Sequence, residues 1–152
     1  MGRKGDHMRI TDLLDKNSIC LDASPADKTE ALNQIVSLMG KSGKINDIEA
    51  YRKQVFLREE ESTTGIGEGI AIPHGKCDAV TKPGLAAMVV KDGVDFDSLD
   101  GEPVTLLFLI AAPNTEDNVH LDVLSKLSVL MMDEDFSESL RNAKTVDEFL
   151  NI

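Results

Sequence analysis

Cysteine, long apolar runs and positive charge are all scarce in this chain. The two cysteines, Cys20 and Cys77, lack CxxC spacing and make no disulfide framework, which favours a reducing compartment. The longest apolar run, Val104–Pro113, is far shorter than the roughly 20 residues of a membrane-spanning helix. The formal net charge of −11 opposes binding to nucleic acid or to anionic membranes. We therefore expect a cytoplasmic protein with no nucleic-acid partner and no membrane insertion.

The length and composition fit one globular domain. A chain of 152 residues, 41% hydrophobic and 28% charged, can bury a sizeable core but is too short for two full domains. We interpret the polar residues 1–7 as a remnant of cloning, so His7 is discounted and the domain is expected over residues 8–152. No internal repeat or flexible linker stands out.

Hydrophobic periodicity predicts helices that cover buried strands. Apolar residues at helical spacing favour a helix over 28–41, started by Ser24-Pro25, and a second over 46–60. Continuous apolar runs favour strands that are buried on both faces. The other expected elements are a helix over 10–14, strands over 19–21, 70–72, 85–90 and 104–110, a helix over 119–132, and two short final helices, the last with a Thr145–Glu148 capping box.

These elements predict an α/β fold with a mixed central β-sheet flanked by helices, a three-layer α/β/α sandwich with about four to six strands. The helices over 28–41 and 46–60 should pack together as a hairpin. The inner face of the second should carry Ile48, Tyr51, Val55 and Phe56, and that of the helix over 119–132 should carry Leu121, Leu124, Leu127, Val129 and Leu130.

The tripeptide Pro73-His74-Gly75 is the strongest candidate for chemistry. We expect His74 to end the strand over 70–72. Proline restricts the backbone before the histidine, and glycine lets a partner surface approach after it. A neutral imidazole is nucleophilic and a good leaving group near neutral pH, which suits reversible phosphoryl transfer. The alternative is a histidine that is hydrogen-bonded in a turn.

The glycine-rich segment before His74 could hold a phosphoryl group. Its backbone can expose N–H groups at positive φ, and two threonines add hydroxyl donors. It is neither a Walker A motif nor a dinucleotide-binding fingerprint, and the alternative is a tight turn. The candidate phosphate-binding residues are Thr63, Thr64, Gly65, Gly67 and Gly69.

Two further side chains could stabilise an anion. Arg58 ends the second helix, and a guanidinium binds phosphate in a bidentate way, although it could instead pair with its acidic neighbours. His120 lies near a helix N-terminus, which favours anions, although it could be an ordinary exposed residue. His74 and Cys77 provide only two possible zinc ligands, so no metal and no cofactor are expected.

Taken together, these motifs identify a resemblance. The stretch from Arg58 through Thr63-Thr64-Gly65-Ile66-Gly67-Glu68-Gly69 to Pro73-His74-Gly75 resembles the signature of phosphotransferase-system (PTS) IIA domains of the fructose, mannitol and nitrogen-regulatory type. The similarity continues through Leu106–Pro113 and Asn118–Leu121, and it covers essentially all of residues 8–152.

The resemblance implies a phosphotransferase with a mannitol-IIA-like fold. His74 corresponds to the histidine that accepts a phosphoryl group from the carrier HPr and passes it to a IIB domain, which in fructose and mannitol systems receives it on cysteine. A IIC membrane component would complete such a system. Arg58 and His120 correspond to residues beside that histidine, while Glu68 stands where the family often has Asn or Asp.

The resemblance leaves the biological role open. The segment Gly101–Leu127 is most similar to the fructose branch, which favours sugar uptake. The alternative is a nitrogen-type regulator whose phosphorylation state controls other proteins. A pure interaction domain would be expected to lack His74 or Arg58, and both are present. The sugar, the oligomeric state, and whether the chain is a free protein or part of a IIABC polypeptide are left undecided.

Overall fold

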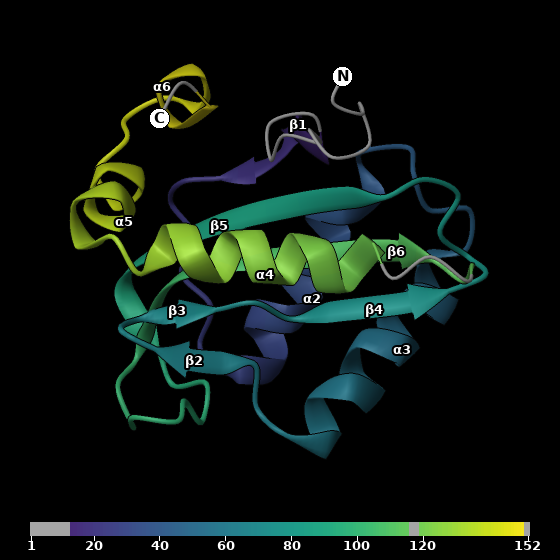
Figure 1. The fold of residues 1–152 in the computed structure, drawn as a ribbon, viewed down its shortest axis with the longest axis horizontal. Coiled ribbons are helices and arrows are strands. Elements are labelled where there is room, and N and C mark those ends of the chain that lie inside the picture. The colour runs from purple at the N-terminus through teal and green to yellow at the C-terminus, as the bar shows by residue number, and fades with distance from the viewer. Residues whose placement is uncertain (1–12, 116–118, 151–152) are drawn as a thin grey trace.

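A mixed β-sheet runs through the middle of the protein (Figure 1). The computed structural model describes residues 13–115 and 119–150, without the side chains of Val119 and His120. The strand order is β1-β5-β6-β3-β2, and β4 also pairs with β6. The strands are β1 (Leu14–Cys20), β2 (Gly65–Gly67), β3 (Ile70–Ala71), β4 (His74–Cys77), β5 (Gly84–Val94) and β6 (Val104–Pro113).

Helices cover both faces of this sheet, which confirms the predicted three-layer sandwich. One layer holds α2 (Lys28–Gly40) and α3 (Ile48–Glu61), and the other holds α4 (Val119–Met131), α5 (Glu134–Arg141) and α6 (Val146–Leu150) (Figure 1). Among the described residues, no helix is long and apolar enough to cross a membrane.

The central strands are buried on both sides, as their continuous apolar runs predicted. Successive residues of β5 alternate between the two cores: Met88 packs with α2 and α3, whereas Val89 packs with α4, α5 and α6. The same alternation separates Leu107 from Phe108 on β6. Because side chains of a strand point alternately to opposite faces, each central strand contributes to two hydrophobic cores at once.

The helix starts depend on aspartate caps. The cap of α2 is Asp27, whose Oδ1 accepts a hydrogen bond from the Glu30 backbone N–H at 2.9 Å. Glu30 Oε1 in turn accepts from the Ala26 N–H at 2.6 Å, so the predicted start at Ser24-Pro25 is wrong. For α3, the predicted start is confirmed, because the side chain of Asp47 accepts from the backbone N–H of residue 50.

The first strand is longer than predicted. The strand expected over 19–21 is only the end of β1, which begins at Leu14. Most of the helix predicted over 10–14 lies outside the described residues, and its last residue belongs to this strand. The polar residues of β1 and an irregularity in its register between Leu14 and Ile19 removed the regular alternation that would have identified it.

The buried face of α4 also differs from the prediction. Val123, Leu127 and Met131 are buried against the sheet, whereas Leu121 is 49% exposed and Val129 is 65% exposed. The buried positions recur every four residues, as one face of a helix requires. Since apolar residues occur all around this helix, periodicity alone could not identify the face that meets the sheet.

A short break at Ile72-Pro73 separates β3 from β4. Both strands pair in parallel with β6, and Ile70↔Leu106 and His74↔Ile110 belong to the same register. The Ile110 N–H donates to the Pro73 carbonyl at 3.0 Å, which carries the pairing across the break. His74 therefore begins a strand, contrary to the prediction that it ends one.

Helix α3 packs unusually close to β4 at Gly75. A Cβ atom added there would lie 2.9 Å from Val55 Cγ2 and 3.1 Å from Tyr51 Cε1, which is too close for either contact to be accommodated without movement. The Tyr51 hydroxyl also donates to the Ile110 carbonyl at 2.8 Å, directly beside His74 in the sheet register. Glycine therefore sets the separation between this helix and the strand that carries His74.

We predict that Gly75→Ala lowers the free energy of unfolding by about 1–3 kcal/mol, because the added methyl group overpacks the contact with α3. Chemical denaturation measures the change. A suitable control is Gly40→Ala, where the added Cβ would meet the flexible tip of the Ile48 side chain at 3.2 Å and helix propensity favours alanine. Equal stability of wild type and Gly75→Ala would contradict the close packing.

Candidate active site

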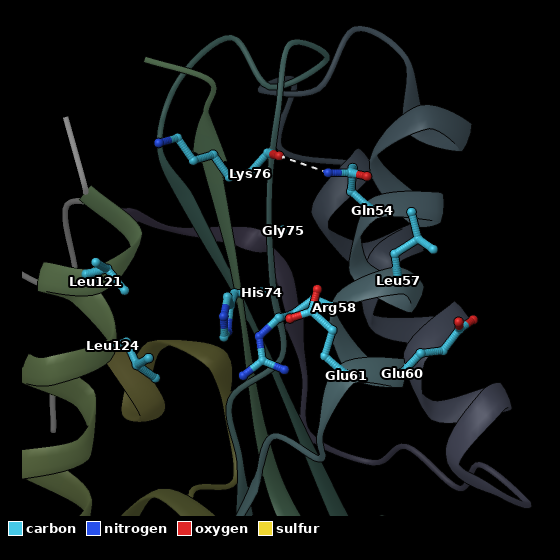
Figure 2. A pocket seen from close by; sticks show the side chains of 10 residues that line it. All are labelled: Gln54, Leu57, Arg58, Glu60, Glu61, His74, Gly75, Lys76, Leu121 and Leu124. Atoms are coloured by element: carbon cyan, nitrogen blue, oxygen red, sulfur yellow. Dashed lines mark hydrogen bonds between the residues drawn. The ribbon is translucent and has the colours of Figure 1, made fainter. Parts of the chain in front are cut away.

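The predicted residues His74 and Arg58 lie together in one surface pocket. Its volume is about 850 Å³. Figure 2 shows β4 between α3 on one side and the first turns of α4 on the other, with the Arg58 guanidinium beside the His74 ring. The pocket therefore lies over the edge of the sheet, between the two helix layers. Its lining residues are Gln54, Leu57, Arg58, Glu60, Glu61, His74, Gly75, Lys76, Leu121 and Leu124.

The alternation of β4 explains how residues from both helix layers meet here. Gly75 faces α3, so its neighbour His74 points to the opposite face of the sheet, toward α4. Among the residues that the structure describes, β4 pairs with β6 on one side, and on the other side Gln54 Nε2 donates to the Lys76 carbonyl at 3.3 Å. The long side chain of Arg58 can therefore reach around this edge to the histidine.

The imidazole of His74 is held in one tautomer. Its Nδ1 lies 3.1 Å from the Ile72 carbonyl oxygen, and since a carbonyl only accepts, Nδ1 carries the proton. Nε2 is then the nitrogen with the lone pair in the neutral ring. Burial lowers the pKa of His74 from its ordinary value of 6.5; the Ile72 hydrogen bond opposes this change, and the positive charge of Arg58 adds to it. The site thus favours a neutral, nucleophilic imidazole.

The guanidinium of Arg58 is itself held by a hydrogen bond. Its Nη1 donates to the Ser62 carbonyl at 3.0 Å, just beyond the end of α3. A guanidinium has five N–H donors, so this bond leaves others to meet an anion beside His74. The acidic side chains of Glu60 and Glu61 also line the pocket, which gives it mixed charge.

His120 is placed only in part. Its backbone lies in the first turn of α4, and its side chain is outside the described residues. Leu121 and Leu124 of the same turns line the pocket, so the start of α4 borders the site, as the sequence predicted. A role for the His120 side chain stays a prediction.

The glycine-rich segment has other contacts than those predicted. None of Thr63, Thr64, Gly65, Gly67 and Gly69 lines the pocket. Thr63 Oγ1 donates to the Phe96 carbonyl, and the Thr64 hydroxyl donates to Glu59 Oε1 at 2.6 Å. The segment forms a tight hairpin of β2 and β3 that pairs with β6. The observed contacts of these five residues are structural, and the phosphate-binding role predicted for them stays a prediction.

Glu68 occupies the turn of this hairpin in the left-handed region, with φ of 58°. Asn and Asp adopt this conformation more readily than other non-glycine residues. The Glu68 N–H donates to Asp100 Oδ2 at 2.9 Å, and Arg141 Nη2 donates to the Glu68 carbonyl at 2.8 Å. These backbone contacts hold the strained residue in place.

Some site residues were not identified from the sequence. Leu57 and Lys76 line the pocket although no motif marks them, and Leu121 lines it although it was predicted to face the core. Glu59 is one of the acidic neighbours with which Arg58 could pair on the sequence alone, yet it is 7% exposed and bonded to Thr64. An acidic run at a helix end looks like ordinary solvated charge, so the sequence contained no signal for its burial. Among the described residues, no three His, Cys, Asp or Glu side chains are grouped to hold a metal.

The fold and site define an α/β/α protein with a neutral histidine and an arginine at an open sheet edge. The family model described as "Phosphoenolpyruvate-dependent sugar phosphotransferase system, EIIA 2" matches residues 12–152. The chain belongs to this family, which confirms the resemblance found in the sequence.

Named relatives include fructose-specific components. The chain is 44% identical over 145 residues to the fructose-specific EIIABC component of Bacillus subtilis, covering 95% of this chain but only 23% of that protein. It is 41% identical over 127 residues to the fructose-specific EIIA component of Haloferax volcanii, covering 84% of this chain and 82% of that one. The chain thus spans less than a quarter of the first relative and most of the second.

Solved structures share the whole fold. The nitrogen regulatory protein IIA-Ntr of Neisseria meningitidis superposes with a TM-score of 0.86 at 30% identity, covering 93% of this chain and 97% of that one. Enzyme IIA for mannitol from Escherichia coli, in its complex with phosphorylated enzyme IIB, superposes with a TM-score of 0.78 at 31% identity, covering 91% and 96%. The mannitol-IIA-like fold is confirmed.

We predict that Arg58→Ala raises the pKa of His74, because removing a nearby positive charge makes protonation of the imidazole easier. An NMR titration of the ring protons measures this. Arg52→Ala is the matched control, since Arg52 lies on the same helix but binds Glu49 and Asn33 outside this pocket. A pKa that stays constant in Arg58→Ala would show that the guanidinium does not act on the ring.

We also predict that Glu68→Asn raises the free energy of unfolding by about 0.5 kcal/mol or more, because asparagine tolerates positive φ better. Chemical denaturation of Glu68→Gln is the control, since it removes the same charge without easing the backbone. Equal gains in both variants would assign the effect to charge instead.

Proposed function

We propose that the protein is a phosphocarrier whose His74 accepts a phosphoryl group from phospho-HPr and passes it to a IIB domain. The observation that carries this proposal is the contact between Nδ1 of His74 and the Ile72 carbonyl, which leaves the lone pair on Nε2. The Nε2 lone pair attacks phosphorus, and the P–N bond to the HPr imidazole breaks with its electron pair remaining on HPr. In the second transfer the acceptor thiolate of IIB attacks phosphorus, and the P–N bond to His74 breaks with its electron pair returning to Nε2.

The transition state of such a transfer needs charge stabilisation and alignment more than a base. Arg58 supports this role, because its guanidinium lies beside the ring that would carry the phosphoryl group. We propose that His120 also stabilises the charge of the transition state, because its backbone lies at the start of α4, next to Leu121, which lines the pocket.

The surface around the pocket suits protein partners. His74 lies in a depression that is flanked by Leu57, 45% exposed, and Leu121, 49% exposed, from opposite helix layers. Exposed apolar side chains of this kind supply the area that the core of a protein–protein interface buries. We place the reaction in the cytoplasm, with HPr and IIB as successive partners and a IIC membrane component as the partner of IIB in a transport system.

We infer uptake of a fructose- or mannitol-type sugar as the leading role, because fructose-specific relatives share 44% and 41% identity with this chain. A regulatory role is the second candidate. The observation that favours it is the similarity to IIA-Ntr over 93% of this chain. The two roles share His74 and differ in whether a IIB domain removes the phosphoryl group.

The decisive experiment incubates the protein with phosphoenolpyruvate, enzyme I and HPr. We expect acid-labile phosphate on the wild type and on Arg52→Ala, and none on His74→Ala, because only the last lacks the nucleophile. Since the pKa of His74 is lowered, phosphorylation of His74 should persist below pH 6.5. It should decline only as the pH falls through the lowered pKa, where the ring becomes protonated.

Addition of purified IIB domains then separates the roles. Loss of phosphate to a fructose- or mannitol-type IIB supports sugar uptake, whereas phosphate that stays on His74 with every such IIB favours regulation. A wild type that takes no phosphate from active phospho-HPr contradicts the phosphocarrier proposal and leaves an interaction domain.

A further inference from the structure

We propose that Glu59 is a positioning residue that holds both Arg58 and His74 in place, an inference that rests on the proposed phosphocarrier function. Glu59 does not line the pocket. It is the next residue after Arg58 on α3, and its carboxylate lies in the interior, where it joins two chains of hydrogen bonds that end at the two site residues.

The carboxylate of Glu59 is buried and fully engaged. Its side chain is 4% exposed. Oε2 accepts from the Thr64 backbone N–H at 2.8 Å and lies 3.0 Å from Lys28 Nζ, while Oε1 accepts from the Thr64 hydroxyl at 2.6 Å. A buried carboxylate is tolerated only with such partners, so this geometry is strongly constrained.

The first chain of contacts reaches Arg58. The two bonds from Glu59 to Thr64 close the backbone of residues 59–64 into a short loop at the end of α3. The carbonyl of Ser62 lies within that loop and accepts from Arg58 Nη1 at 3.0 Å. Glu59 therefore fixes the backbone group that orients the guanidinium.

The second chain reaches His74. The Thr64 carbonyl accepts from the Ile72 N–H at 3.0 Å, and the Ile72 carbonyl accepts from His74 Nδ1. Two residues, Thr64 and Ile72, thus connect the Glu59 carboxylate to the ring that would carry the phosphoryl group. The Ile72 carbonyl selects the tautomer of His74. A displacement of Thr64 would move Ile72 and thereby change which ring nitrogen carries the proton.

Lys28 anchors this arrangement to the rest of the fold. Its ammonium also lies 4.8 Å from the centre of the Phe96 ring and 3.7 Å from Asp97 Oδ2. The Phe96 carbonyl accepts from the Thr63 hydroxyl at 2.7 Å. The start of α2, the end of α3, the segment before β2 and the segment after β5 therefore meet at one carboxylate.

The test compares Thr64→Val with Thr64→Ser. Valine has the shape of threonine but cannot donate to Glu59, whereas serine keeps the hydroxyl. We expect Thr64→Val to accept the phosphoryl group from phospho-HPr about tenfold more slowly, since small displacements of reacting groups have effects of this size or larger. Thr64→Ser should stay within about twofold of wild type, because it retains the hydrogen bond.

A second readout does not depend on phosphoryl transfer. Nitrogen-15 NMR of the unphosphorylated protein reports which ring nitrogen of His74 carries the proton. We expect the Nδ1–H form to dominate in wild type and Thr64→Ser and to lose population in Thr64→Val. Thr81→Val is the control, since it removes a threonine hydroxyl bond to the Lys44 carbonyl away from the pocket and should change neither readout.

The outcomes separate this inference from the proposed function. A folded Thr64→Val with wild-type tautomer and wild-type transfer rate overturns the role of Glu59. A wild type that accepts no phosphoryl group overturns the phosphocarrier function, while the tautomer comparison still tests the link to His74. If Thr64→Val does not fold, Glu59→Gln replaces it. The glutamine amide has one oxygen that accepts and one nitrogen that does not, so one of the two hydrogen bonds from Thr64 is lost. The transfer rate and the tautomer population are then measured on this variant.

Discussion

The close contact between α3 and β4 is the constraint on which the site depends. Gly75 has no Cβ, so Val55 and Tyr51 lie directly against the strand backbone. Arg58 follows one turn after Val55 on the same helix and is thereby brought to the strand edge beside His74. If α3 and β4 were further apart, Arg58 would stay in the α3 layer while His74 faces α4, and the sheet edge would separate the two side chains.

The break between β3 and β4 has an equally local effect. It places His74 at the first position of an edge strand, where the backbone is held by β6 while the side chain is open to a partner. The Ile72 carbonyl at the break is turned to the imidazole instead of a neighbouring strand. The same irregularity therefore opens the His74 side chain to the pocket and orients Nδ1 toward a hydrogen-bond acceptor.

The electrostatics of the pocket contrast with those of the whole chain. A net charge of −11 disfavours the approach of any anionic partner. Arg58 and Lys76 line the pocket and provide local positive charge beside Glu60 and Glu61. Such mixed charge favours specific orientation of a partner more than general attraction.

The sequence by itself determined the layers and the place of the candidate site. Continuous apolar runs predicted β5 and β6, amphipathic patterns predicted α2 and α3, and the Pro73-His74-Gly75 tripeptide with Arg58 pointed to two residues that line one pocket. These features depend on residue type and short spacing, which the sequence displays directly. Only the tertiary structure decided the tautomer of His74, the burial of Glu59 and the contacts of the glycine-rich segment, because each depends on groups that other elements bring together.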